Sequence, residues 1–341
     1  MKRTTAFLAA AAFAAGLGLT APAAAADKLT VAVPGIPPVF GGVVVYVARD
    51  AGIFKKYDLD VTVKAMGSGA AAAKAVDSGS LDAALSPSQF VVTMISNAGV
   101  PLKAIWGMDN PDWLIGTMDA SKTGCDGIKG QPVGVDSPQG ARWIQLNTYL
   151  VRKCKLAIEK DVPTVPMSSN VGTAMASGQL NFGVLHIDDV PVIERMSGKK
   201  VHTVVNLEDV SPGIHYLMMI ARADNIGKKR DAFVRFVAAM RDAADYMHDP
   251  KNLEAVAKMA APTKRDVPDA TYSVTAYSKM MFWPKGTVGL DKARLDGAIK
   301  NQVAVGQRTK GRGGINPEKK PVTVEQLTDL TLWADAEKLK K

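Results

Sequence analysis

Short apolar runs alternate along the chain with stretches whose apolar residues recur at helical spacing. Four of the runs predict strands, over residues 29–33, 59–64, 132–135 and 162–165. Ser78-Gly79 and Ser177-Gly178 are typical of helix ends, where glycine adopts the left-handed conformation. Strands that alternate with helices predict an α/β fold, with mainly parallel sheets flanked by helices.

The chain also repeats itself at an offset of about 100 residues. The aligned pairs are AVDSGSLDAAL (75–85) with AMASGQLNFGV (174–184), YVARDAGI (46–53) with YLVRKCKL (149–156), and, most weakly, FVVTMISNAGVPLKAI (90–105) with DVPVIERMSGKKVHTV (189–204). In the last pair Gly99 stands opposite Gly198. Two copies of such length indicate two similar lobes rather than a solenoid.

The last third of the chain is predicted to be mostly helical. Six apolar residues recur at helical spacing before Asp249-Pro250: Phe233, Phe236, Val237, Met240, Ala244 and Met247. Thr323 and Gln326 form a capping-box pattern, and residues 216–220 predict a strand. We therefore expect a first lobe of residues 27–117 plus 216–341, with the C-terminal helices, and a second lobe of residues 118–215.

The N-terminus has the pattern of a secretory signal peptide. Lys2 and Arg3 precede an apolar stretch over 6–19, and Ala24-Ala25-Ala26 matches a cleavage site. We expect residues 1–26 to be removed. No cysteine stands directly after the apolar stretch, where a lipid anchor would need one, so we expect a soluble periplasmic protein without a lipid anchor.

Composition indicates an ordinary globular protein, with 47% hydrophobic and 22% charged residues and a net charge of +9. The densest basic group, Arg308, Lys310 and Arg312, lies in a Gly-rich segment and is expected to be solvated surface. We expect no nucleic-acid partner, which would require a focused basic stripe. The mild basic excess agrees with an anionic ligand.

Cys125 and Cys154 are the only cysteines. In an exported protein an even pair predicts a disulfide, while two buried free thiols are the alternative.

Ligands of open parallel sheets bind beyond the carboxyl ends of the strands, so we expect the loops there to face a cleft between the lobes. Ser86-Pro87-Ser88 and Ser137-Pro138-Gln139-Gly140 precede predicted helices and read equally well as helix caps or as anion sites at helix N-termini. The predicted ligand contacts are Gly35, Ile36, Pro38, Phe40, Ser86, Pro87, Ser88, Asn110, Ser137, Pro138, Gln139, Gly140, Arg142, His186 and Asp188.

The stretch GVLHIDDVPV (183–192) places His186 close to Asp188 and Asp189. Ligand contact, helix capping by either aspartate, and metal or acid–base chemistry all remain open, although one histidine with acids lacks the usual metal ligand count. If His186 contacts the ligand from a loop, its alanine variant should lose affinity without a change in melting temperature. No P-loop, nucleophile elbow, H-E-x-x-H motif or zinc-type cysteine spacing occurs. We expect no catalytic residue, metal or cofactor.

Three segments resemble the nitrate/sulfonate/taurine-type solute-binding proteins of ABC transporters: YVARDAGIFKKYDLDV (46–61), AVDSGSLDA (75–83) and GIKGQPVG (127–134). The resemblance implies a two-lobed, type II periplasmic binding protein. It places ligand contacts after the first strand and in the segments that match Ser86 to Ser88, Ser137 to Gly140 and His186 to Asp188. The family often has a Trp-Glu-Pro loop where this chain has His186-Ile187-Asp188-Asp189.

The expected function is therefore capture of a small organic anion, such as a sulfonate or a carboxylate, by hinge closure. The expected partners are an ABC permease and its ATPase, and the protein is expected to be a monomer. Three alternatives remain: a binder of a pyrimidine precursor or other heterocycle, an enzyme on the same fold, and a sensor component.

Overall fold

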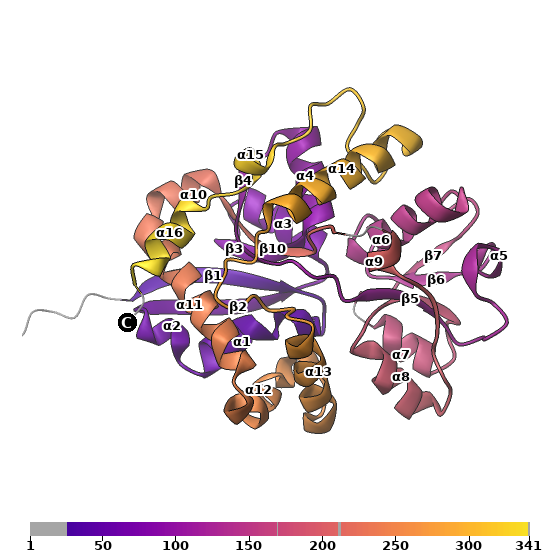
Figure 1. Cartoon of the computed structure of the whole chain (residues 1–341), viewed down its shortest axis with the longest axis horizontal. Coiled ribbons are helices and arrows are strands. Elements are labelled where there is room, and N and C mark those ends of the chain that lie inside the picture. Colours follow the sequence, from indigo (N-terminus) through magenta and orange to yellow (C-terminus); the bar gives the residue numbers. More distant parts are fainter. Residues whose placement is uncertain (1–25, 169, 211–212, 340–341) are drawn as a thin grey trace, which may run out of the picture.

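The protein folds into two lobes, each built on a five-stranded sheet (Figure 1). This computed structural model describes residues 26–168, 170–210 and 213–339. The sheet of lobe one has the order β2 (Leu59–Met66), β1 (Asp27–Pro34), β3 (Ala83–Pro87), β10 (Leu217–Arg222) and β4 (Leu102–Met108). The sheet of lobe two has the order β7 (Thr164–Pro166), β6 (Val133–Val135), β8 (Phe182–His186), β5 (Trp113–Thr117) and β9 (His202–Asn206). The expected two-lobed α/β architecture is confirmed.

The two sheets follow the same plan. In lobe one, β1 pairs in parallel with β2 and β3, and β10 runs antiparallel between β3 and β4. In lobe two, β6 pairs in parallel with β7 and β8, and β5 runs antiparallel between β8 and β9. Each antiparallel strand lies next to a point where the chain crosses between the lobes. The crossings therefore supply one reversed strand to each otherwise parallel sheet.

Helices cover both faces of each sheet. The first half of lobe one contributes η1 (Phe40–Gly42), α1 (Val43–Asp50), α2 (Ile53–Lys56), α3 (Gly69–Asp77) and α4 (Ser88–Ala98). Lobe two contributes α5 (Gly124–Ile128), α6 (Ala141–Tyr149), η2 (Leu150–Cys154), α7 (Val171–Ala176), α8 (Asp189–Ser197) and α9 (Leu207–Val210). The C-terminal part contributes α10 (Ala223–Lys228), α11 (Arg230–His248), η3 (Pro250–Asn252), α12 (Leu253–Met259), η4 (Ala261–Thr263), α13 (Val267–Lys279), α14 (Lys292–Thr309), α15 (Val324–Leu327) and α16 (Thr331–Glu337). None of the helices in the described ranges is long and apolar enough to span a membrane.

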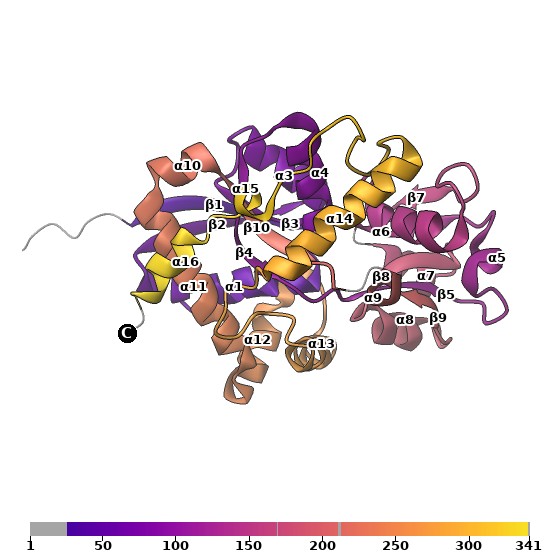
Figure 2. The ribbon, with the colours of Figure 1, turned by 45° about the horizontal axis from the view of Figure 1, so that its top comes forward.

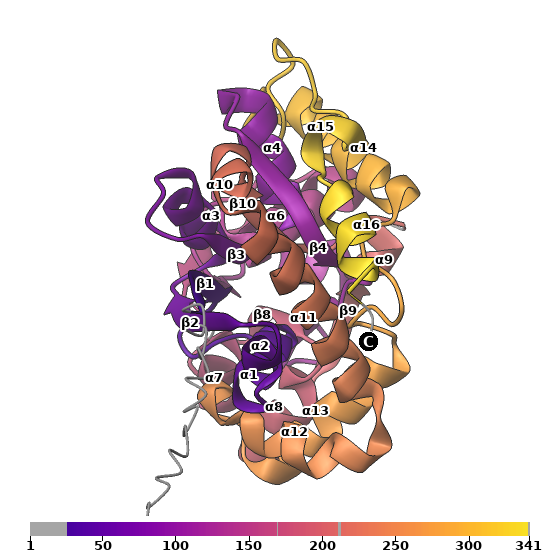
Figure 3. The same cartoon turned by 90° about the vertical axis from the view of Figure 1, so that its left-hand side faces the viewer.

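Alternate side chains of β1 pack into two different hydrophobic cores. Leu29, Val31 and Val33 belong to the core cluster that includes α1 and α11, whereas Ala32 belongs to the cluster formed with α3 and α4. Successive side chains of a strand point to opposite faces, so the two clusters lie on the two sides of the sheet. Figure 3 shows α3 and α4 on one side of this sheet and α1 and α2 on the other.

The internal repeat corresponds to the repeated architecture. Helices α3 and α7 end at Ser78 and Ser177, and the glycine after each has a positive φ, as expected for a C-terminal stop. The weakest alignment is also reproduced, because Gly99 ends α4 and Gly198 ends α8 in the same left-handed conformation.

The predicted C-terminal helices form as well. All six residues of the predicted apolar stripe are buried in α11, which ends before Asp249. The Thr323–Gln326 capping box is present, although its helix ends at Leu327 and Leu330 is 47% exposed.

The boundary between the lobes differs from the expected one, and the expected signal peptide lies almost entirely outside the described residues. Residues 113–117, which we assigned to lobe one, form β5 in the sheet of lobe two, so the expected boundary at residue 117 is wrong. A strand that pairs antiparallel with β8 has to enter the second sheet immediately after the crossing. We propose that the crossings lie at about residues 109–112 and, within the described residues, at about 213–216. The expected signal peptide falls on residues 1–26, of which 1–25 lie outside the described residues.

The expected disulfide between Cys125 and Cys154 is confirmed, with Cα atoms 5.3 Å apart. It joins the start of α5 to the end of η2, so it fixes the helical edge of lobe two.

Replacing Cys154 with serine is expected to lower the free energy of unfolding by about 3 kcal/mol, because the bridge closes a loop between residues 29 apart in sequence and restricts the unfolded chain. Urea unfolding followed by circular dichroism measures the change. The double variant Cys125→Ser/Cys154→Ser controls for a stray thiol and should not respond to reductant. An unfolding midpoint equal to that of the unaltered protein would contradict a stabilising role.

Candidate functional site

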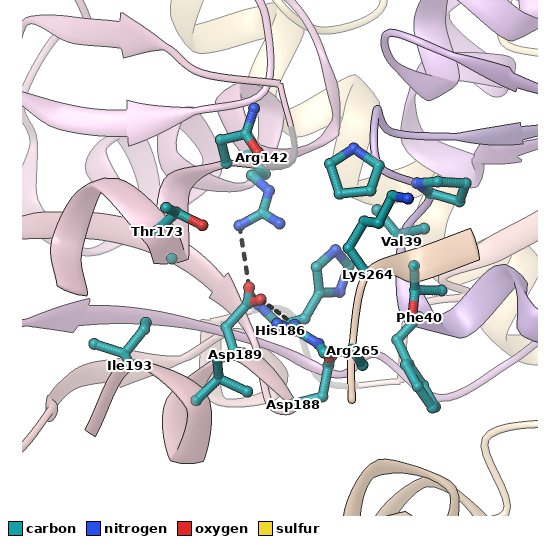
Figure 4. A pocket seen from close by; sticks show the side chains of 16 residues that line it. Val39, Phe40, Arg142, Thr173, His186, Asp188, Asp189, Ile193, Lys264 and Arg265 are labelled. Carbon is teal, nitrogen blue, oxygen red and sulfur yellow. Dashed lines mark hydrogen bonds and ion pairs between the residues drawn. The ribbon is translucent and has the colours of Figure 1, made fainter. Parts of the chain in front are cut away.

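Two adjoining cavities lie between the lobes. We call the first, of about 90 Å³, the polar cavity, because Arg142, His186, Asp188, Asp189, Lys264 and Arg265 line it together with residues 37–40 (Figure 4). We call the second, of about 30 Å³, the apolar cavity; its lining includes Pro34, Val39, Pro87, Trp113, Tyr216 and Leu217. Val39, Arg142 and His186 line both, so the two cavities form one narrow cleft.

The ends of equivalent strands bring the lining together. Residues 34–40 follow β1 in lobe one, and Pro87 ends β3. In lobe two His186 ends β8, and Arg142 lies in the first turn of α6 after β6. This is the edge at which open parallel sheets bind ligands.

Arg142 is buried under the cleft, with 2% of its surface exposed. Its Nη1 donates to the carbonyl of Val184 and lies 3.5 Å from Asp189 Oδ2. Its guanidinium carbon lies 5.4 Å from the centroid of the Trp113 ring, which suits a cation–π contact. Backbone, carboxylate and ring therefore fix this cation at the junction of the two cavities.

Arg265 reaches across the cleft from the segment between η4 and α13. Its Nη2 donates to Asp188 Oδ2 and to Asp189 Oδ1, at 2.6 Å each. Burial raises the pKa of Asp189, but attraction to Arg142 and Arg265 outweighs it and lowers the pKa to about 2. The pair of aspartates thus ties a C-terminal segment of lobe one to α8 of lobe two.

A second chain of polar contacts runs beside this pair. Nδ1 of His186 lies 2.8 Å from Asp112 Oδ2, and the hydroxyl of Tyr277 contacts both Asp112 Oδ2 and, at 2.6 Å, Asp188 Oδ1. Burial, followed by the charges of Asp112 and Asp188, raises the pKa of Tyr277 well above its usual value, so the phenol stays a donor. Tyr277 thereby joins the crossing segment to lobe two.

Three buried polar atoms at the cleft have no hydrogen-bond partner among the described residues: His186 Nε2, Trp113 Nε1 and Asp112 Oδ1. Because Nδ1 of His186 faces a carboxylate, it carries the proton of the neutral ring and leaves Nε2 for another partner. The ring centroids of His186 and Trp113 lie 4.1 Å apart, so the two rings are in contact. Buried polar groups rarely stay unpaired, so these atoms mark this part of the cleft as a candidate ligand surface.

Asp112, His186 and Asp188 each offer a metal-ligand atom, and the three atoms lie within 4.8 Å of one another. However, Tyr277 contacts both of these carboxyls, and Arg265 donates to that of Asp188. A structural zinc site also needs four ligands. The geometry therefore favours a hydrogen-bonded network over a metal centre.

Seven of the predicted contact residues line the cleft: Gly35, Pro38, Phe40, Pro87, Arg142, His186 and Asp188. Eight do not line either cavity: Ile36, Ser86, Ser88, Asn110, Ser137, Pro138, Gln139 and Gly140. Ile36 is 56% exposed, and Nδ2 of Asn110 donates to the carbonyl of Met280 at 2.9 Å.

The serine pair at the start of α4 does not act as the expected cap. Helix α4 begins at Ser88, and Pro87 occupies the N-cap position without a side-chain hydrogen bond. Ser86 Oγ donates to the carbonyl of Gly69 at 3.0 Å, and Ser88 Oγ donates to that of His215. Both hydroxyls are used inside lobe one.

The expected cap of α6 is also wrong. The helix begins at Ala141 rather than after Ser137, and the carboxylate of Asp136 accepts the amides of Ala141 (2.8 Å) and Arg142 (3.1 Å). An acid four residues upstream of Gly140 thus takes the place that an anion was expected to fill. The capping role considered for Asp188 is not seen either, since its carboxylate turns to Tyr277 and Arg265.

Sequence reasoning missed Asp112, Tyr277, Lys264 and Arg265. The partners of Asp112, Tyr277 and Arg265 lie between 74 and 165 residues away in sequence, so no local motif marks these three. Lys264 is exposed and has a left-handed backbone at the end of η4, and its side chain extends along the polar cavity opposite Arg142 (Figure 4). The basic pair Lys264-Arg265, which stands just before α13, is a sequence signal that could have drawn attention to this segment.

The comparisons with known proteins agree with this geometry. The model of the family described as "NMT1/THI5 like" matches residues 41–252, which is more than half of the chain. A search of the curated proteins found no match.

Several solved structures share the fold. A protein from Bordetella bronchiseptica RB50 is similar over 92% of this chain and 98% of its own, with 18% identity and a TM-score of 0.76. The periplasmic nitrate-binding protein NrtA from Synechocystis PCC 6803 covers 92% of this chain and 89% of its own, with 14% identity and a TM-score of 0.69. The alkanesulfonate-binding protein SsuA from Xanthomonas axonopodis pv. citri, bound to MOPS, covers 89% and 99%, with 14% identity and a TM-score of 0.67. At such identities the likeness shows the fold, which is that of type II periplasmic binding proteins.

The Asp189 ion pairs predict a specific acid sensitivity. Because the folded pKa of about 2 lies below the usual 3.8, Asp189 stabilises the fold above about pH 4, and this stabilisation is lost as the pH falls towards 2. Its full contribution is about 2 kcal/mol. Urea unfolding of the unaltered protein and of Asp189→Asn should differ by less at pH 2.5 than at pH 5. Asp60→Asn, which removes an exposed carboxylate, serves as the control and should show no such convergence.

Tyr277→Phe keeps the ring but removes the hydroxyl that contacts Asp112 and Asp188. We expect a loss of about 1–3 kcal/mol in the free energy of unfolding, because buried carboxyl oxygens lose their donor. Tyr272→Phe, on an exposed position of the same helix, is the matched control. Equal stability of the two variants would remove Tyr277 from the network.

Proposed function

Because the chain belongs to the NMT1/THI5-like family, we propose that it is the solute-binding component of an ABC importer, and that it captures a small organic anion in the periplasm. The proposed ligand class is a sulfonate or an aliphatic or aromatic carboxylate. Relatives in fold that are described as nitrate-binding and alkanesulfonate-binding proteins support an anion.

The observation that carries the proposal is the position of Arg142. It lies at the junction of the polar and apolar cavities, and in the described part of the chain Nη1 is the one guanidinium nitrogen with a partner, namely Val184 and Asp189. The rest of the guanidinium fork is available for a carboxylate or sulfonate, which it matches in geometry. Lys264 supplies a second cation at the mouth, and Trp113 Nε1 supplies a neutral donor.

The apolar cavity supports an organic rather than an inorganic anion. Pro34, Val39, Pro87 and Leu217 surround it together with the ring of Trp113. An anionic head at Arg142 would leave the remainder of the ligand against these side chains. The small volumes of both cavities favour a compact molecule.

Hinge closure is the proposed mechanism. Two crossing segments join the lobes, and Arg265 and Tyr277 hold Asp188 from across the cleft. A ligand that neutralises part of this charge, or contacts both lobes, would shift the equilibrium towards the closed form. We propose delivery to a membrane permease with its ATPase, and action as a monomer that binds its solute without catalysis or cofactor.

A heterocyclic ligand such as a pyrimidine precursor is the second candidate. Asp112 Oδ1 and His186 Nε2 are unpaired acceptors beside the ring of Trp113 in the neutral state of the histidine. A flat ring that carries both donors and acceptors would stack on Trp113 and use them.

The decisive experiment begins with a mass spectrum of any ligand released on denaturation of the purified protein. Thermal-shift and calorimetric titration then compare a panel of sulfonates and carboxylates with neutral pyrimidines. Stabilisation by an anion alone supports the proposal, and stabilisation by the pyrimidines alone rejects it.

Lys264→Ala should weaken binding of the anion that emerges from this panel by about tenfold without lowering the melting temperature, because the side chain is exposed. Lys285→Ala removes an exposed lysine that lines neither cavity and should have no effect. His186→Ala is a poorer probe than expected: the side chain is buried and contacts Asp112, so its loss also lowers stability. Unchanged affinity in Lys264→Ala would remove the lysine from the site.

A further inference from the structure

A larger hollow lies away from the cleft, where α14 of lobe one meets the end of α6 and η2 of lobe two. Its volume is about 760 Å³ and it is open to solvent. Nine residues between 147 and 161 line it from lobe two, and Arg308, Thr309 and Arg312 line it from lobe one. Figure 2 shows α14 extending from lobe one towards α6. The hollow thus belongs to both lobes at once.

Positive charge is concentrated here. Five exposed cationic side chains line the hollow, which we call the basic groove: Arg152, Lys155, Lys160, Arg308 and Arg312. The only acid in the lining is Asp161, whose carboxylate accepts the amide of Ala157 at 2.7 Å. The fold therefore brings three basic residues of lobe two next to the basic segment at 308–312. From the sequence, that segment was expected to be solvated surface.

Arg308 and Arg312 contact neutral groups here, and Arg312 also lies close enough to Glu159 to contribute to the lowered pKa of that carboxyl. Nη1 of Arg308 donates to the carbonyl of Val151 at 3.2 Å, and the guanidinium carbon of Arg312 lies 6.0 Å from the centroid of the Trp143 ring. Both partners are neutral. Guanidinium groups held in this way keep free N–H groups for carboxylates.

An unpaired donor points to a ligand independently of the charge. Asn147 lines the groove, is 2% exposed, and its Nδ2 has no hydrogen-bond partner in the part of the chain that the structure describes. A buried amide of this kind requires an acceptor, which an incoming carboxylate or carbonyl provides. Val151, Leu156 and Ile158 add an apolar floor.

We propose that the basic groove is a docking site for an acidic, partly apolar peptide segment of a protein partner. A concave surface presents its cations to a protruding chain, whereas a flat lipid surface would contact only the rim. Carboxylates of the segment pair with the arginines and lysines, a backbone carbonyl meets Asn147, and apolar side chains cover Leu156 and Ile158. The proposal does not depend on which solute the cleft binds.

Docking would also favour the arrangement of lobes seen here. Nη1 of Arg152 donates to Asn301 Oδ1 at 2.6 Å and already joins lobe two to α14. A segment that contacts both walls of the groove binds this arrangement better than one in which the walls separate, so it selects that state.

The test uses the full protein and a fluorescein-labelled peptide of alternating glutamate and leucine, with fluorescence anisotropy as the readout. Lys160→Glu/Arg312→Glu reverses one charge on each wall and should weaken peptide affinity at least about tenfold. Lys74→Glu/Lys285→Glu makes the same change in net charge on exposed positions elsewhere and should leave affinity unchanged. Added salt should weaken binding, because exposed charges are screened.

Two further probes separate other partners. Vesicles of phosphatidylglycerol and phosphatidylcholine, and a single-stranded oligonucleotide, are titrated against the same variants. If the vesicles or the oligonucleotide bind more tightly than the peptide, and this binding is lost in the groove variant, the proposal is overturned. Equal peptide affinity in the groove variant and the control variant also overturns it. The groove variant should retain the thermal shift produced by the anion panel. If no anion of the panel stabilises the unaltered protein, the proposed solute class is rejected. The peptide measurement tests the groove independently of that result.

Discussion

Charge buried between the two lobes is the constraint on which the arrangement of the cleft depends. Arg142 and Arg265 lie on either side of Asp189, and an ion buried without a partner would cost several kcal/mol. Each lobe supplies a charge that the other has to balance, so the lobes meet across the cleft in a defined geometry rather than through a general apolar contact. Tyr277 extends the same network to Asp112 at the crossing segment.

The repeated plan of the lobes explains where the cleft lies but not what it recognises. Equivalent strand ends bring Pro87 and His186 to one place. At the start of the helix that follows β6, the carboxylate of Asp136 accepts the amides of Ala141 and Arg142, so these two amides are not offered to an anion. Arg142 thereby becomes the centre of the candidate site.

The features that could be predicted from the sequence depend on neighbouring residues or on the periodic spacing of apolar residues. The Ser-Gly stops, the apolar stripe of α11 and the capping box of Thr323 need only neighbouring residues, and the structure has all of them. The boundary at residue 117 failed because β5 is defined by its pairing with β8, about 70 residues later in the chain. Ser137 failed as a cap because Asp136 beside it is a competing acceptor.

The sequence by itself determined that this is a two-lobed α/β protein, that its strand-end loops face a common cleft, and that Arg142, His186 and Asp188 belong to the candidate site. Hydrophobic periodicity and the internal repeat carry that information along the chain. Only the tertiary structure decided that Tyr277 and Arg265 reach the aspartates of lobe two, and that Arg152 and Arg312 share one groove. Such contacts depend on how the lobes and the C-terminal helices pack against each other. Because the paired residues are far apart in the sequence, no local sequence motif predicts which buried charges will meet.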